Sequence, residues 1–335
     1  RTEHPLVLSP WCETVSADGS IVSTVADMCA YARLLLNCGE GSAGRLLSDA
    51  SFVLLTGRHV EDPTEDDWYG YGLGVYEKAG RTLIGHSGGM VGVSSCLMID
   101  PGAGLAVVVL MNGNEDRRDL ADYVLEAGWA TAGGHVVPAP PPPTDPCDLG
   151  AAAAEYAGVF AAPGDGAGSL TLVADDGRLI LRRGGADLVL ERVDGDVFLV
   201  PHPDLDRFTL RFWRDDDGRI AYATHGPGWY AGPAYGGPAS FPPVAHAAAV
   251  CGHYHTWSAW MSHLRVVARR GALWLIAPWV DEPGGEIELV PLGDGCYRVG
   301  REEWRPDRLT VDTVLDGAAT RATYDFLPFY RAATP

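Results

Sequence analysis

The segment Gly85-His86-Ser87-Gly88-Gly89 holds the residue types that nucleophilic catalysis uses. It matches the pattern G-x-S-x-G, in which a serine on a tight turn between a strand and a helix attacks a carbonyl carbon. The residues that follow, Val91–Ile99, alternate as in a strand instead of showing a helical period. A second interpretation therefore places His86–Gly89 at the end of an edge strand whose backbone faces a substrate.

The first interpretation corresponds to the nucleophile elbow of α/β-hydrolases, with Ser87 as the nucleophile. Such enzymes also need an acid and a histidine on later loops between strands and helices. The rest of the chain lacks the alternation of strands and helices that would place them. This interpretation stays as the less favoured alternative.

Three helices and four strands are expected around this segment. Thr24 and Asp27 form a T-x-x-D capping box ahead of an apolar stripe, and that helix ends at residues 37–39. Further helices are expected at about residues 49–56 and 117–130, and strands at residues 68–76, 81–86, 93–99 and 105–111. The pattern predicts an antiparallel sheet with helices, an α+β fold.

A proline-rich stretch, Pro138–Pro146, separates this part from a second part with an all-β pattern. In the second part, Thr171–Leu181 aligns without gaps on Arg265–Leu275, and Leu190–Phe198 aligns on Leu289–Tyr297. We therefore expect two copies of about ninety residues, each a small closed barrel. The expected organisation is a first domain at residues 1–135, a linker at 136–150, and barrels at 151–240 and 246–335.

Several motifs of the first part resemble, in the same order, the C-terminal part of the penicillin-recognising serine hydrolases. These are class C β-lactamase-like enzymes, D-aminopeptidases and esterases. The matching segments are Gly19–Met28, Leu46–Ser48, Tyr69–Val75, Gly85–Gly92 and Val107–Asn112. The resemblance implies a partial β-lactamase-like domain that hydrolyses amides or esters through an acyl-serine. The tandem β-modules resemble the lipocalin-like C-terminal domains of such enzymes.

In this family a serine and a lysine in S-x-x-K act as nucleophile and base, a tyrosine in Y-x-N assists, and K-T-G or H-x-G lines the edge strand. His86-Ser87-Gly88 matches the third element. The resemblance implies that His86 is a partly cationic donor and that Ser87 binds the carboxylate or carbonyl of the substrate. It also implies that Gly88 admits the substrate backbone and that the Gly89 amide is an oxyanion donor. No cofactor and no metal is implied.

The first two elements of the family pattern are absent from this sequence. Lys78 is the only lysine, Val75 stands three residues before it, and no tyrosine has an asparagine two positions later. We therefore expect the nucleophile and base upstream of Arg1, so that this chain alone is inactive in acyl transfer. The alternative is a non-catalytic binding module, or a subunit that completes its site with another chain.

The composition is that of an ordinary globular protein, with 335 residues, 47% of them apolar and 21% charged. The net charge of -19 argues against nucleic acid as a partner, and no apolar run is long enough to span a membrane. Seven scattered cysteines without a C-x-x-C pair favour a reducing compartment, so we expect a cytoplasmic location, with export left open. The expected partner is a small peptide, amide or ester substrate, and self-association is left open.

Other clusters are assigned structural roles. His253 and His255 share a strand face with His263 nearby, but no carboxylate or cysteine stands at metal-ligand spacing. Four tryptophans could form a sugar-binding platform, although core filling is the commoner reason for them in a small barrel; they are Trp257, Trp260, Trp274 and Trp279. The acidic runs at residues 61–67 and 215–217 are interpreted as solvated turns, and the glycine-rich residues 69–74 as a closely packed strand.

Overall fold

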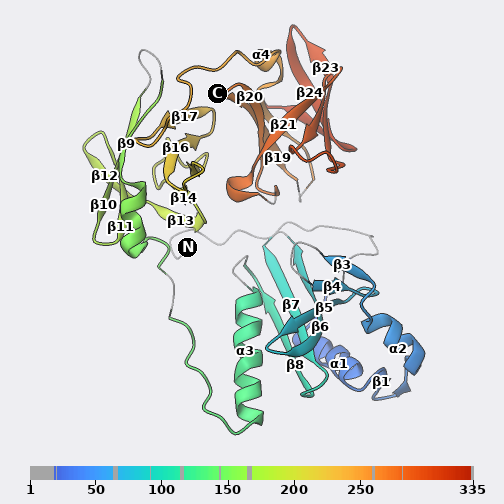
Figure 1. Cartoon of the computed structure of the whole chain (residues 1–335). Coiled ribbons are helices and arrows are strands. Elements are labelled where there is room, and N and C mark those ends of the chain that lie inside the picture. Colours follow the sequence, from blue (N-terminus) through green and yellow to red (C-terminus); the bar gives the residue numbers. More distant parts are fainter. Residues whose placement is uncertain are drawn as a thin grey trace. The chain divides into compact units, whose positions relative to one another are not determined.

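The computed structural model describes residues 19, 21–62, 67–90, 92–113, 117–142, 145–163, 168–258, 261–280 and 282–332 of the chain. The chain divides into two compact units, Arg1–Pro142 and Pro143–Pro335 (Figure 1). No helix in these described ranges is long and apolar enough to cross a membrane.

The first unit is an antiparallel sheet with helices, which confirms the predicted α+β fold. Its six strands lie side by side in chain order: β3 (Val60–Asp62), β4 (Asp67–Tyr69), β5 (Gly74–Lys78), β6 (Arg81–Met90), β7 (Val93–Asp100) and β8 (Leu105–Met111). The other elements are α1 (Val25–Leu36), the short ribbon of β1 (Glu40–Gly41) and β2 (Gly44–Arg45), α2 (Asp49–Thr56) and α3 (Arg117–Ala132). Thr24 caps α1 by accepting from the Asp27 N–H at 3.3 Å, as the capping box predicted.

Side-chain alternation along the sheet divides the core of the first unit into two layers. On β7, Leu97 and Ile99 pack with residues of α1 on one face. Cys96 and Met98 pack with residues of α3 on the other face. Successive residues of the neighbouring strand β6 therefore point toward different helices.

The strand predicted at residues 68–76 is wrong in its length, because a turn divides it into β4 and β5. The Gly70 N–H donates to the Leu73 carbonyl at 2.7 Å, and Gly72 between them has a φ of 81°. A Cβ at Gly70 would lie 2.6 Å from the Leu55 carbonyl oxygen, so the turn packs directly against α2. The glycines of this stretch therefore serve a turn rather than a continuous strand.

The second unit is all-β apart from short helical turns. Its first copy is a nine-stranded sheet made of β9 (Gly158–Ala161), β10 (Ser169–Asp175), β11 (Arg178–Arg183), β12 (Ala186–Val189), β13 (Glu191–Asp194), β14 (Val197–Leu199), β15 (Leu210–Arg214), β16 (Ile220–His225) and β17 (Gly228–Ala231). The second copy is a closed barrel made of β18 (Gly252–His255), β19 (His263–Arg269), β20 (Ala272–Ile276), β21 (Glu286–Gly293), β22 (Cys296–Val299), β23 (Arg308–Leu315), β24 (Ala318–Tyr324) and β25 (Leu327–Arg331). The helical turns are η1 (Gly150–Tyr156), α4 (Ala247–Val250) and η2 (Pro283–Gly285).

The two copies differ at one strand, which corrects the prediction of two closed barrels. In the first copy the fully buried Leu190 separates β12, which pairs with β11, from β13, which pairs with β14. The corresponding segment of the second copy is the single strand β21, which pairs with both β20 and β22. The Leu190 N–H donates to the Leu179 carbonyl at 2.9 Å, so the chain bends there while it stays bonded to β11. The first copy is therefore a barrel-like sheet with one broken strand.

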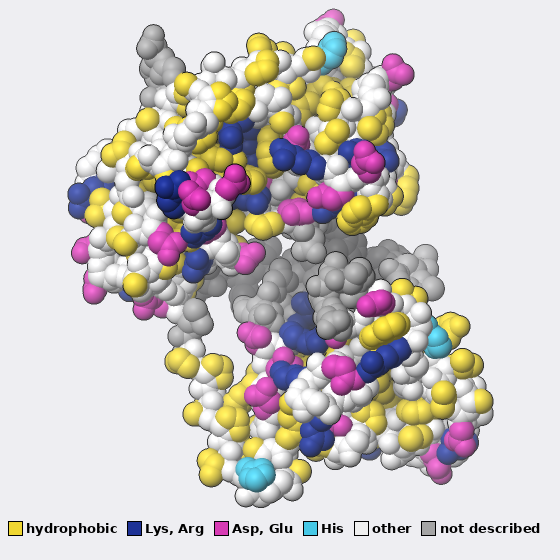
Figure 2. Space-filling view, in the orientation of Figure 1, with side chains coloured by type: hydrophobic (Ala, Val, Ile, Leu, Met, Phe, Trp, Pro, Cys, Tyr) yellow, Lys and Arg dark blue, Asp and Glu magenta, His cyan; other side chains and the backbone are white. Residues whose placement is uncertain are grey.

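Basic side chains lie beside acidic ones on the face that Figure 2 shows. The ion pairs of the second unit include Arg301 with Glu288 at 2.6 Å and Arg219 with Asp215 at 2.9 Å. Most such pairs are partly exposed, and pairs of this kind contribute little to stability individually.

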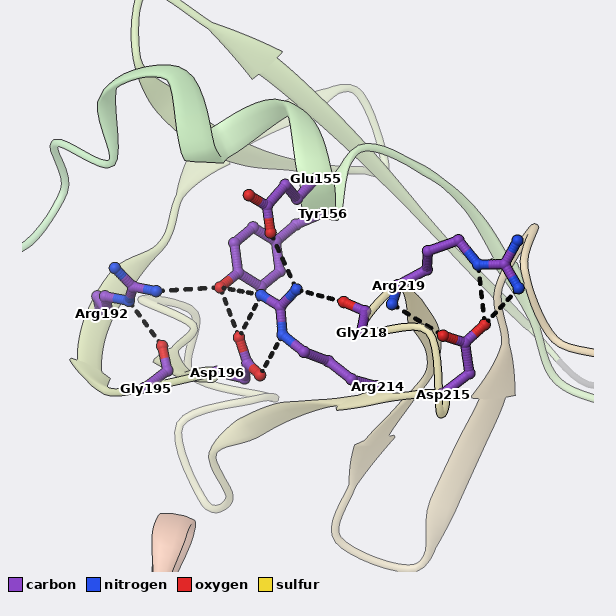
Figure 3. Close-up of polar contacts among 9 residues, drawn as sticks. All are labelled: Glu155, Tyr156, Arg192, Gly195, Asp196, Arg214, Asp215, Gly218 and Arg219. Atoms are coloured by element: carbon purple, nitrogen blue, oxygen red, sulfur yellow. Dashed lines mark hydrogen bonds and ion pairs between the residues drawn. The ribbon is translucent and has the colours of Figure 1, made fainter.

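A polar network ties η1 to the hairpin turns of the first copy (Figure 3). The Tyr156 hydroxyl at the end of η1 donates to Asp196 Oδ1 at 2.6 Å, and Arg214 Nε donates to Asp196 Oδ2 at 2.9 Å. Burial by itself would raise the pKa of the Asp196 carboxyl, but the hydrogen bonds from Arg214 and Tyr156 hold that pKa below its ordinary value. Asp196 therefore stays ionised at neutral pH and links the three elements.

Candidate functional site

The segment His86–Gly89 lies in the second half of β6. The first half of β6 has a neighbouring strand on each side, whereas the second half is paired on one side. Among the described residues, β5 pairs with β6 only as far as Gly85. β7 continues beside it to Met90. The prediction of an edge strand is therefore confirmed for the half after Gly85, whereas Arg81–Gly85 has a strand on each side.

The ring of His86 is exposed and is held by a hydrogen bond at each nitrogen. Nδ1 lies 2.5 Å from the Ser87 carbonyl oxygen, which can only accept, so Nδ1 carries a proton. Nε2 lies 2.8 Å from the Tyr69 hydroxyl on β4. In the neutral ring Tyr69 donates to Nε2, and in the imidazolium Nε2 donates to the Tyr69 oxygen. Protonation therefore reverses the direction of this bond without breaking it.

Tyr69 is a residue of the candidate site that sequence reasoning missed as a partner of His86. The two residues lie 17 positions apart in the sequence and on strands that are separated by β5. No short-range pattern relates them, because their contact depends on the order of strands in the sheet. A predicted sheet order would have been the only signal.

The Ser87 side chain points to the opposite face of β6 from His86, because successive strand residues alternate. Its Oγ lies 3.9 Å from Cys96 Sγ on β7, and burial raises the pKa of the Cys96 thiol. Cys96 is therefore protonated at neutral pH, and no histidine, lysine or carboxylate of the described residues contacts the Ser87 hydroxyl. The structure gives Ser87 no base that would activate it as a nucleophile.

The nucleophile-elbow alternative for Ser87 is wrong for this fold. Ser87 lies inside β6 and is followed by two more residues of the same strand before Met90, and no helix begins there. The neighbouring strands β5 and β7 run antiparallel to β6, whereas the elbow requires a strand-to-helix turn.

The two glycines after Ser87 have different surroundings. A Cβ at Gly88 would lie 2.7 Å from Ser95 Oγ, whereas the nearest atom of the described residues to a Cβ at Gly89 would be the Val93 carbonyl oxygen at 3.9 Å. The backbone around Gly89 is therefore open, and that around Gly88 is close to the Ser95 hydroxyl. Among the described residues, the space beside Gly89 on its Cβ side is therefore unoccupied.

Lys78 has a structural role in the first unit. Its Nζ lies 2.6 Å from Asp122 Oδ2 and 3.3 Å from Glu126 Oε1, both on α3. The ammonium group therefore joins β5 to α3 through two carboxylates. It does not contact Ser87 or His86.

The histidines of the second copy lie together without forming a metal site. The rings of His253 and His263 are 5.7 Å apart, and the described residues contain no group of three or more His, Cys, Asp or Glu that could hold a metal ion. Burial, with the positive charge of Arg265 as a second cause, lowers the pKa of His253 to about 4. Burial also lowers the pKa of His263 and of His225.

These histidines predict that the second unit loses stability in mild acid. Between the ordinary pKa of 6.5 and the folded value of about 4 for His253, the unfolded chain binds a proton that the folded chain does not. Stability contributed by the neutral rings is therefore complete above about pH 6.5 and decreases as the pH falls toward 4. Urea unfolding at pH 7.5, 6 and 5 should show falling midpoints, and His253→Gln should weaken that dependence. Identical pH profiles for the two proteins would contradict this role of His253.

The tryptophans do not form a single platform. Trp279 packs on Tyr324 in the barrel, with ring centroids 4.8 Å apart, whereas Trp257 is 89% exposed and Trp274 lines a cavity. Trp260 lies outside the described residues.

The acidic run at residues 215–217 is a turn, as predicted. Asp215 accepts from the Arg219 N–H at 2.8 Å and from Arg219 Nε at 3.0 Å (Figure 3). The carboxylate of this turn is therefore bonded to an arginine of the same turn. Most of the other acidic run, at residues 63–66, lies outside the described residues.

Comparison with known proteins bears on the first unit. Residues 2–129 match the family model described as Beta-lactamase. These residues are therefore similar to the beta-lactamase family. Penicillin-binding protein 4 of Amycolatopsis lactamdurans is 31% identical to the chain over 147 residues, which cover 41% of the chain and 38% of that protein. The chain therefore spans well under half the length of this curated relative.

Two solved structures also show similarity to the chain. One, described as "Crystal structure of SurE", is 24% identical with a TM-score of 0.22 and covers 56% of this chain and 43% of that chain. The other, described as "Crystal structure of SurE with D-Leu", is 24% identical with a TM-score of 0.21 and covers 56% and 44%.

Proposed function

We propose that this chain provides the substrate-binding edge of a serine hydrolase of the D-aminopeptidase or esterase type. The observation that carries the proposal is the free half of β6 in a segment similar to the beta-lactamase family. That half combines His86, Ser87 and the open backbone at Gly89. The reaction would cleave an amide or ester of a small peptide through an acyl-serine.

Each residue of this edge has a proposed part in binding. The Gly89 N–H donates to the oxyanion that forms when the carbonyl carbon is attacked, and one such donor supplies about 3–4 kcal/mol of barrier lowering. Ser87 binds a carboxylate or carbonyl from one side of the strand. His86, held by Tyr69 at 2.8 Å, presents its ring on the other side. A substrate that lies along the strand edge would contact the side chains of both Ser87 and His86.

The proposed nucleophile and base come from residues that this sequence does not contain. The sequence has no S-x-x-K and no Y-x-N, Lys78 is paired with two carboxylates, and no base among the described residues contacts the Ser87 hydroxyl. In the proposed reaction a serine oxygen outside this sequence bonds to the carbonyl carbon and the amine or alcohol leaves with a proton. Water then releases the acid and restores the serine.

The two β-copies are proposed to be lipocalin-like domains. The closed antiparallel barrel of β18–β25 supports this, because lipocalins close a single antiparallel sheet in the same way.

Covalent labelling tests the proposed function. Intact-mass spectrometry of the 335-residue protein, after a fluorophosphonate and separately after a penicillin, should show no adduct. A longer polypeptide with an S-x-x-K segment ahead of this chain should gain one adduct, which peptide mapping places on the serine of that segment. An adduct on Ser87 of the 335-residue chain would contradict the proposal, and labelling of neither protein would favour a binding module.

Ser87→Ala separates substrate recognition from chemistry in the longer polypeptide. We expect acylation by the penicillin, which has a carboxylate, to slow by about tenfold to a hundredfold, the worth of one hydrogen bond to a charged group. Acylation by the uncharged fluorophosphonate should change little. Equal slowing with both reagents would show that Ser87 does not recognise the carboxylate.

A further inference from the structure

The second unit contains a cavity of 630 Å³ between the two β-copies. Its wall from the first copy is the outer face of β15 and β16, and its wall from the second copy is the outer face of β19–β21. Sites for small organic molecules are commonly about 300–1,000 Å³ and lined by aromatic groups with a few placed polar ones. The volume falls within that range, and the lining combines aromatic side chains with several arginine and glutamate side chains.

Flat groups stacked on one another form the first wall. Trp213 on β15 and Tyr222 on β16 are opposite each other in the strand register, and their rings are 5.6 Å apart at an angle of 7°. Arg211 Cζ lies 3.8 Å from the Trp213 ring centroid, and Arg270 Cζ lies 3.6 Å from the Tyr222 ring centroid. Each ring of the stacked pair therefore carries a guanidinium group.

The lining has hydrogen-bond donors without acceptors. Trp274 Nε1 and Arg270 Nε are buried and have no partner among the described residues. Neither Arg211 nor Arg270 forms an ion pair within the described part of the chain. Arg211 Nη1 donates to the Pro283 carbonyl at 2.8 Å, and the Arg270 side chain is hydrogen-bonded to Tyr222. Burial lowers the pKa of Arg211, as expected for a cation that lacks full compensation.

Each of the four carboxylates of the same lining forms an ion pair with an arginine, and Arg305 is shared by two of them. The pairs are Glu286 with Arg269 at 2.5 Å, Glu288 with Arg301 at 2.6 Å, Glu282 with Arg305 at 2.5 Å, and Glu302 with Arg305 at 2.9 Å. Within the described part of the chain, none of these carboxylates forms an ion pair with Arg211 or Arg270.

The backbone at Arg270 is unusual for its residue type. Arg270 and Gly271 form the two-residue turn between β19 and β20, with φ values of 50° and 76°. The equivalent turn of the first copy is Asp176-Gly177, and Asp294-Gly295 follows the same pattern, as expected because Asp and Asn tolerate this conformation. An arginine here is held in a less favourable conformation, which is typical of a residue kept for its side chain.

We propose that this cavity binds a small organic carboxylate that carries a flat ring. The carboxylate supplies the acceptor that the N–H groups of Arg270 and Trp274 lack, and the ring packs among the aromatic side chains that surround it. Charge-assisted bonds to a guanidinium are strong and directional, which selects carboxylates over neutral relatives. This site is independent of the one on β6.

Phenylacetate is the probe that tests the proposal. Titration into the 335-residue protein, followed by calorimetry and by tryptophan fluorescence, should show saturable binding, because Trp213 and Trp274 line the cavity. Phenylacetamide has the same shape without the charge, and we expect it to bind at least about tenfold more weakly. A titration with inorganic phosphate shows whether negative charge without a ring is sufficient for binding. Equal binding of phenylacetate and phenylacetamide, or no saturable binding of phenylacetate, would overturn the proposal.

Arg270→Asn is the matched variant, because asparagine suits the positive φ of this turn and the fold should be retained. Its thermal midpoint should equal or exceed that of the parent, while phenylacetate affinity falls at least about tenfold. Arg183→Gln, which changes an exposed arginine on β11 outside the cavity lining, is the control and should bind as the parent does. Undiminished binding by Arg270→Asn would place the ligand elsewhere.

Discussion

Replacing Arg269 by alanine is expected to destabilise the second unit by about 3–5 kcal/mol, the cost of leaving a buried charge without its partner. The side chains of Arg269 and Glu286 are 1% and 0% exposed, and Arg269 Nη2 lies 2.5 Å from Glu286 Oε2. Arg269 Nη1 also donates to the Gly226 carbonyl at 2.9 Å, so the same group joins the barrel to the first copy. Arg269→Ala leaves the Glu286 carboxylate and the Gly226 carbonyl without this donor.

Urea unfolding followed by circular dichroism measures this loss, and two further variants interpret it. The double variant Arg269→Met with Glu286→Leu removes both charges and should recover most of the stability, because apolar replacements of buried pairs are often neutral. Arg182→Ala breaks the pair of Arg182 with Asp187, whose side chains are 58% and 59% exposed, and should cost less than about 1 kcal/mol. If Arg269→Ala costs no more than Arg182→Ala, the buried pair does not stabilise the fold.

Gly85→Ala is expected to destabilise the first unit by at least about 3 kcal/mol, the upper end of the usual range for overpacking. A Cβ at Gly85 would lie 2.0 Å from the Leu97 carbonyl oxygen and 3.3 Å from the Met98 Cα. These are backbone atoms of β7 and cannot rotate away as a side chain can. Relief would require β6 and β7 to separate at the residue that precedes His86.

Gly89→Ala is the matched control, because Gly89 lies on the same strand and its nearest neighbour would be 3.9 Å away. Thermal unfolding of the two variants should differ by several degrees, with Gly89→Ala close to the parent. Equal melting temperatures would show that the sheet adjusts freely at Gly85.

The elements of the first unit could be predicted because each depends on neighbours in the sequence. Thr24 with Asp27 marks the start of α1, and alternation from Val93 marks β7. These signals act within a few residues, so a single sequence contains them. The repeat in the second unit was equally visible, since its two copies retain aligned hairpins.

The missed features depend on packing between distant segments. Nothing near Leu190 distinguishes the bent strand of the first copy from its continuous counterpart β21, since both copies place a buried leucine there. The contact of Tyr69 with His86 and the stacking of Arg270 on Tyr222 join residues on different hairpins. Such contacts depend on the order of strands in the sheet and on the packing of the two β-copies against each other. Local sequence patterns do not encode either of these.

The ion pairs of Lys78 with α3 have a consequence for chemical labelling. Lys78 is the only lysine, so its Nζ is the only side-chain amine on the chain that an acylating reagent can modify. The contacts of Nζ with the carboxylates of Asp122 and Glu126 bind the amine to α3 while α3 is packed on the sheet, and a reagent must displace these contacts to reach it. The rate of acylation at this one position therefore reports how often α3 separates from β5, in a protein that needs no engineered probe.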